Sequence, residues 1–73
     1  MAFEIFGVEE VIRNEIMRGL NQTQIAKTYA LGIRSSAATD WKIVNKMIED
    51  RWSLSGLTRI KNMAWSGSCF PPD

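Results

Sequence analysis

The chain shows its helical character most plainly in Leu20-Asn21-Gln22-Thr23-Gln24-Ile25-Ala26-Lys27-Thr28-Tyr29-Ala30, where a polar start precedes apolar residues at helical spacing. Asn21 and Thr23 are both good N-caps, and Asn21 with Gln24 three residues later resembles a capping box. The side chains that repeat at helical spacing, and so form the buried side, are Ile25, Ala26, Tyr29 and Ala30. Glycine commonly ends a helix, so we predict a helix from Asn21 or Thr23 to Gly32.

A second helix is predicted before this one, over Gly7–Arg18. Its apolar residues step by four, with Val11 beside them, and are Val8, Ile12, Ile16 and Leu20. Glu9 and Glu10 fall in its first turn, where the helix dipole favours anions. Gly19 is well placed as the left-handed residue that ends the helix, with Leu20 folding back onto it.

Two further helical segments follow. The first begins at a cap on Thr39 or Asp40, and its apolar side, widened by Ile43 and Met47, consists of Trp41, Val44, Ile48 and Trp52. The second begins at a cap on Ser53 or Ser55 and runs to about Trp65, with an apolar line of Leu57, Ile60 and Ala64. Residues 33–39 are either a loop or the start of a longer helix capped at Ser35.

These segments predict an all-α fold, a compact bundle of three or four short helices that includes the option of a helix-turn-helix arrangement. We expect one helical domain over residues 1–67 and a flexible tail over 68–73, because Pro71 and Pro72 exclude helix there. The first helix is expected to cover a core formed by Ile12, Ile16, Ile25, Tyr29, Val44, Ile48, Trp52, Leu57 and Ile60.

The composition argues against an enzyme. The chain of 73 residues has no histidine and a single cysteine, Cys69. It therefore has no common general base and no set of ligands for zinc, and we expect neither a cofactor nor a metal. No apolar run approaches the roughly 20 residues of a membrane span, and Glu4 stands where a signal peptide has a basic residue. We therefore expect a cytoplasmic protein that does not enter a membrane.

Several polar and basic side chains lie where a DNA-binding protein would use them. Gln22, Thr23, Gln24 and Lys27 surround a helix start that could face a phosphate, although the same residues could simply cap a surface helix. Bases would be read by Arg34, with Ser35 and Ser36, if the next helix begins early. They would be read by Lys42, Asn45 and Lys46 if the helix begins at Asp40. Arginine and asparagine are residue types that pair with base edges through two hydrogen bonds.

The chain resembles the helix-turn-helix superfamily over roughly Leu20–Trp52, and the run Gln22-Thr23-Gln24-Ile25-Ala26-Lys27 is the most similar part. The family places its small residue four positions before a turn glycine, whereas Ala26 precedes Gly32 by six, so the turn here would be longer. The resemblance implies a small transcriptional regulator of bacterial or phage type that binds duplex DNA. A single unit makes few contacts, so we expect a homodimer.

A protein-binding module, such as an inhibitor or adaptor, is the alternative interpretation. The net charge is only +1, which is weak for a protein that binds phosphates. Trp65 lies near the end of the last helix beside Met63 and could anchor a partner, because tryptophan and arginine dominate interface hot spots. Arg51, Arg59 and Lys61 would then form the rim of that surface, or else a phosphate-contacting edge or a solvated face.

Overall fold

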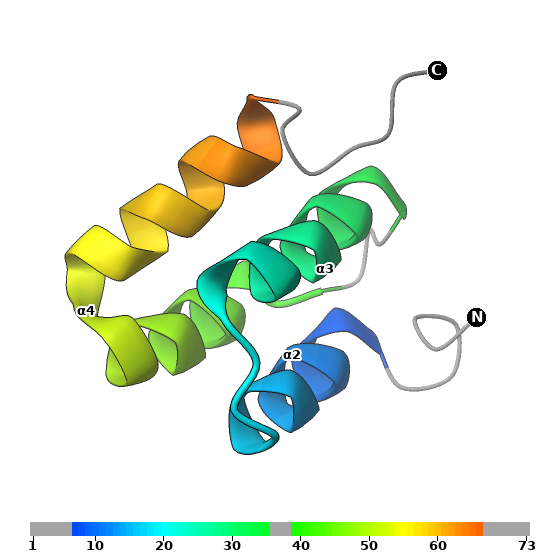
Figure 1. Cartoon of the computed structure of the whole chain (residues 1–73). Helices are drawn as coiled ribbons and strands as arrows, with labels where there is room; N and C mark the ends of the chain where they lie inside the picture. The colour runs from blue at the N-terminus through cyan, green and yellow to red at the C-terminus, as the bar shows by residue number, and fades with distance from the viewer. Residues whose placement is uncertain (1–6, 36–38, 67–73) are drawn as a thin grey trace.

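Three helices account for nearly all the residues that the computed structural model describes, which are 7–35 and 39–66. They are α2 (Gly7–Met17), α3 (Gln22–Ser35) and α4 (Trp41–Trp65), and no strand occurs within those two ranges. In Figure 1, α3 lies between α2 and the second half of α4, and it packs against both. The prediction of an all-α bundle is confirmed.

The helix ends follow the predicted capping residues. Gly19 has φ +81°, its N–H donates to the Ile16 carbonyl at 3.0 Å, and the Leu20 N–H donates to the Glu15 carbonyl at 3.0 Å. These two bonds form a Schellman motif, which satisfies the last carbonyls of α2. Asn21 Oδ1 accepts from the Gln24 N–H at 2.9 Å and so caps α3.

Asp40, at the start of α4, makes hydrogen bonds both to α4 and to α2. Asp40 Oδ1 accepts from the Lys42 N–H at 3.0 Å, so the predicted cap is confirmed. The Asp40 N–H in turn donates to Glu9 Oε1 at 3.1 Å, which ties this cap to the first turn of α2. Helices α2 and α4 are therefore linked by a hydrogen bond as well as by their contacts in the core.

Gly32 does not end its helix, and that prediction is wrong. α3 continues to Ser35, and Gly32 is buried inside it. A Cβ at this position would lie 2.6 Å from Val8 Cγ2 and 3.0 Å from the Trp41 ring. Glycine is present because α2 and α4 approach the α3 backbone closely, and not because the chain turns there. Of the ambiguous segment 33–39, residues 33–35 are helical, and 36–38 lie outside the described residues.

The predicted break near Ser53 is present as a bend inside α4. Ser53 has φ 76° and ψ 176°, which separates residues 41–52 from residues 54–65. This backbone conformation favours glycine, so a serine there is strained. The Ser53 and Ser55 hydroxyl oxygens lie 3.0 Å apart beside the bend. Figure 1 shows that the second half of α4 turns back and runs alongside α3.

The core lies where the three helices meet. Its buried hydrophobic residues are Val8, Ile12, Ile25, Ala26, Tyr29, Ala30, Val44, Ile48, Leu57, Ile60 and Ala64. Ile16 and Trp52, which were also predicted, are partly buried against this cluster. Helix α2 contributes directly to the core, because its Val8 and Ile12 are fully buried. Each large side chain of this kind stabilises the fold by ~1.5–3 kcal/mol.

Candidate nucleic-acid interface

The start of α3 presents some of the predicted phosphate-contacting groups to solvent. Thr23, Gln24 and Lys27 are exposed, whereas Gln22 is half-buried. The Gln22 amide lies against Gly56, since a Cβ at Gly56 would be 3.2 Å from Gln22 Nε2. Gln22 therefore packs α3 against the second half of α4, and its neighbours remain on the surface.

The outer side of α3 carries basic groups without acidic neighbours on the same helix. Thr23, Lys27 and Arg34 are all exposed. Their spacings of four and seven residues place them on one side. Residues 22–35 contain no aspartate or glutamate.

The first half of α4 presents Lys42 and Lys46 together. Both are exposed, and their spacing of four residues places them on one side of the helix. Val44 and Ile48 anchor the same segment in the core. Lys46 Nζ lies 3.1 Å from Asp50 Oδ1, but both side chains are more than 60% exposed. Such a pair is worth only ~0.3–0.5 kcal/mol, so it holds the lysine weakly.

Asn45 does not project with these two lysines. It is half-buried, and its Oδ1 accepts from the Tyr29 hydroxyl at 3.2 Å. The Tyr29 ring also lies 4.8 Å from the Trp41 ring. Burial raises the pKa of Tyr29 above its ordinary value of 10.0, so the hydroxyl stays protonated and can donate. Asn45 thus joins α4 to α3.

The predicted DNA-binding residues therefore form two surfaces. Tyr29 faces α4, and Lys27 is two residues away, about 200° around the helix. The α3 stripe with Lys27 consequently faces away from α4, which carries Lys42 and Lys46. The structure brings the two lysines of α4 together but does not place them beside the basic side of α3.

The residues predicted to bind a protein partner likewise do not lie on one surface. Trp65 is 70% exposed and Leu54 is 66% exposed. With Lys61 they share one side of the second half of α4, because spacings of seven and eleven residues complete whole turns. Arg59 and Met63 lie about 140–180° around the helix from Leu54.

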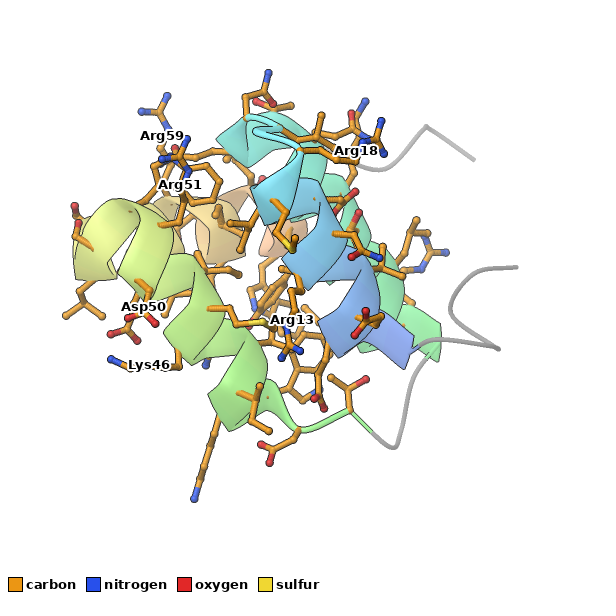
Figure 2. All side chains as sticks on the ribbon, turned by 90° about the horizontal axis from the view of Figure 1, so that it is seen from below. Arg13, Arg18, Lys46, Asp50, Arg51 and Arg59 are labelled. Carbon is orange, nitrogen blue, oxygen red and sulfur yellow. The ribbon has the colours of Figure 1, made fainter. Side chains whose placement is uncertain are left out.

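Arg51, Arg59 and Arg18 lie along one edge of the molecule (Figure 2). Arg51 and Arg59 are the closer pair in that view. The Arg51 guanidinium carbon lies 5.4 Å from the centroid of the Trp52 ring, a distance typical of a cation–π contact. Arg51 precedes the bend at Ser53, and Arg59 lies about 120° around the helix from Trp65, so these two arginines do not surround Trp65 as the alternative interpretation expects.

Two features were missed by sequence reasoning. The first is a groove between α2 and α4 of about 190 Å³, lined by Arg13, Ile16, Met17, Met47 and Asp50. No pattern in the sequence signals it, because Met17 lies outside the apolar stripe that was used to predict α2.

The second is a buried carboxylate. Glu15 is 8% exposed, its Oε2 accepts from the Thr28 hydroxyl at 2.7 Å, and its Oε1 has no hydrogen-bond partner in the described parts of the chain. Burial raises the pKa of Glu15 above its ordinary value, and the Thr28 hydrogen bond and the Arg18 charge lower it by less.

The described residues contain no group of three or more histidine, cysteine, aspartate or glutamate side chains that could hold a metal ion. Nor do they contain a helix with the length and apolar character needed to cross a bilayer. Cys69 and the predicted tail lie outside these residues. Comparison of the chain with protein-family models, curated proteins and solved structures finds no match.

Proposed function

We propose that the chain binds duplex DNA through the first half of α4, as a small transcriptional regulator of bacterial or phage type. The observation that carries this proposal is the joint exposure of Lys42 and Lys46 on a helix that is held firmly on its other sides. Asp40 caps the start of the helix, and Val44 and Ile48 are fully buried. Because the helix backbone is already fixed, binding has to order only the two lysine side chains.

The order of charges along α4 suits a helix that enters the major groove by its first turns. In helix-turn-helix proteins, the N-terminal residues of the reading helix approach the base edges. Lys42 lies in the first turn and Lys46 in the second, whereas Glu49 and Asp50 follow one turn later. Glu49 would then lie farther from the DNA than Lys42, whereas Asp50 lies 3.1 Å from Lys46 and offsets part of its charge.

The distribution of charge along the sequence also favours this proposal. Residues 21–73 contain seven basic and four acidic residues, whereas residues 1–20 contain two basic and four acidic residues. Asn45 supports the fold by its bond to Tyr29, so the proposal assigns contact with DNA first to the two lysines.

Lys42→Ala/Lys46→Ala is expected to weaken binding to duplex DNA. Each lost phosphate contact lowers affinity by nearly tenfold at ~0.1 M salt, and the slope of log affinity against log salt should fall by ~2 in total. Fluorescence anisotropy of a labelled duplex over a salt series measures both quantities. Circular dichroism should show an unchanged helix content, because both side chains are exposed.

Lys27→Ala/Arg34→Ala is the matched control, since it removes the same charge from the outer side of α3. It should keep most of the affinity if α4 carries the interface. An equal loss in both variants would show that binding reflects overall charge and not a site on α4. Absence of binding by the unaltered protein at low salt would end the DNA proposal.

A protein partner is the second candidate, and the exposure of Leu54 and Trp65 on one stripe favours it. These two side chains are eleven residues apart, which is three helical turns, so both can enter a hydrophobic groove in another protein. Leu54→Ser/Trp65→Ala is expected to change the free energy of unfolding by no more than ~0.5 kcal/mol, because both side chains are exposed. It should abolish co-purification of a partner and leave the DNA anisotropy unchanged. A large loss of stability would show that Trp65 belongs to the core.

A further inference from the structure

We propose that the groove between α2 and α4 is the contact face of a symmetric homodimer. The groove is lined by Ile16 and Met47, and Met17 stands at its edge with 77% of its surface exposed. A cavity of about 150 Å³ accommodates a benzene ring, so a groove of about 190 Å³ has room for one large apolar side chain. The same face therefore offers both a projecting apolar side chain and a place to receive one.

The charges at the groove are also self-complementary. Arg13 lines the groove from α2, and Asp50 lines it from α4 (Figure 2). Both are more than half exposed: Arg13 Nη1 is 4.0 Å from Glu10 Oε2, and Asp50 Oδ1 is 3.1 Å from Lys46 Nζ. These are weak surface pairs within single helices, which leave both groups able to pair with a second molecule.

A two-fold axis satisfies both features at once. In an isologous interface, a contact from residue i to residue j is repeated from j to i. Met17 of each copy would enter the groove of the other, and each Arg13 would face the partner's Asp50. An unrelated partner would need its own projecting side chain and opposite charges in the same order, whereas a second copy of this chain has them already.

The apolar surface continues beside the groove. Ile43 is exposed on 40% of its surface and lies one turn before Met47 on α4. It extends the face that the dimer would bury. Asp50 is also next to Lys46, so the dimer would place two copies of the lysine side of α4 beside one interface. Association does not depend on DNA binding and is measured without DNA.

Charge reversal provides the decisive test, by sedimentation equilibrium in reducing buffer so that Cys69 cannot cross-link the chains. Arg13→Glu places two acids at the face, and Asp50→Arg places two bases there. Each variant should be monomeric at concentrations where the unaltered chain dimerises. An equimolar mixture should form heterodimers, because both cross-contacts then join opposite charges. Circular dichroism confirms that both variants remain folded.

Met17→Ser tests the apolar contact. The methionine is used twice in the dimer, so its loss should weaken association by roughly 10- to 100-fold. Leu54→Ser is the matched control, because it removes a similarly exposed side chain from the second half of α4. The inference is overturned if the unaltered chain stays monomeric at ~1 mM. It is equally overturned if the mixed charge variants do not associate, or if Leu54→Ser weakens the dimer as much as Met17→Ser.

Discussion

Gly32→Ala should destabilise the protein by roughly 1–3 kcal/mol, although alanine is the better helix former. The new Cβ would lie 2.6 Å from Val8 Cγ2, 3.0 Å from Val8 Cγ1 and 3.0 Å from the Trp41 ring. The contact at 2.6 Å is too short and the two at 3.0 Å are tight, so the Val8 side chain or the helix that carries it would have to shift. Val8 is fully buried and cannot swing into solvent.

Two opposing effects decide the sign of this change. Alanine in place of a helical glycine stabilises by ~0.5–1 kcal/mol, partly by restricting the unfolded chain. Overpacking of a dense core costs more than this, because neighbours must leave their preferred rotamers. For a domain of this size, each kcal/mol lost lowers the melting temperature by about 4–8 °C. Thermal and urea denaturation measure the change.

Val8→Ala supplies the control, because it removes both of the Val8 carbon atoms that would clash. Alone it should destabilise the protein by leaving a cavity. Combined with Gly32→Ala, the loss should be smaller than the sum of the two single losses, since the new methyl group occupies space that the valine vacated. Additive losses, or a gain in stability from Gly32→Ala alone, would mean that α2 does not pack this closely on α3.

Thr28→Val should cost roughly 2–3 kcal/mol near pH 7, which is large for a change between side chains of equal shape. It removes the hydroxyl that donates to Glu15 Oε2 at 2.7 Å. Both carboxylate oxygens would then lack a hydrogen-bond partner among the described residues, because Oε1 already has none. Glu15→Leu/Thr28→Val is the control, since removal of both polar groups should recover most of the loss.

Glu15 also makes stability depend on pH in a direction opposite to that of most surface carboxylates. Burial raises the pKa of Glu15 in the folded state above the ordinary 4.5, so the folded protein binds this proton more tightly than the unfolded chain. The resulting stabilisation is fully present below about pH 4.5 and is lost as the pH rises through the folded pKa. The difference in unfolding free energy between the unaltered chain and Glu15→Gln should therefore favour the unaltered chain increasingly as the pH falls from about 7 to 4.5. A difference independent of pH would show that Glu15 is solvated.

Local sequence signals were enough for the helices and for most of their ends, but not for the end of α3 at Ser35 or for which residues each helix packs against. Asn21, Gly19 and Asp40 act through hydrogen bonds to near neighbours, so their roles can be read from a few adjacent residues. A glycine in the sequence can mark the end of a helix or a point where another helix packs closely. At Gly32, only the position of Val8 in the folded chain shows that the second case applies. Glu15 is one of several charged residues on α2, so the sequence of α2 alone does not single it out. It is buried because it packs against Thr28 of α3.

The same limit applies to the candidate site. The spacing of Lys42 and Lys46 predicted that they share an exposed side of one helix, and they do. Their relation to Lys27 depends on the angle between α3 and α4, which no local pattern contains. The groove at Met17 likewise arises from two helices that are distant in sequence. The shared side of Lys42 and Lys46 was therefore predictable, whereas the burial of Asn45 against Tyr29 and the surfaces shared by two helices were not.

The bend at Ser53 allows a single chain to cover the apolar residues of the second half of α4. A straight helix of the 25 residues in α4 would be about 37 Å long, which exceeds the longest dimension of the molecule, 30 Å. Leu57, Ile60 and Ala64 would then extend past α3 and would need a second chain to cover them. Because the backbone leaves the helix at one serine, the second half of α4 folds back along α3 and the chain covers these residues itself. If the proposed dimer forms, dilution should therefore separate two folded subunits and not unfold them.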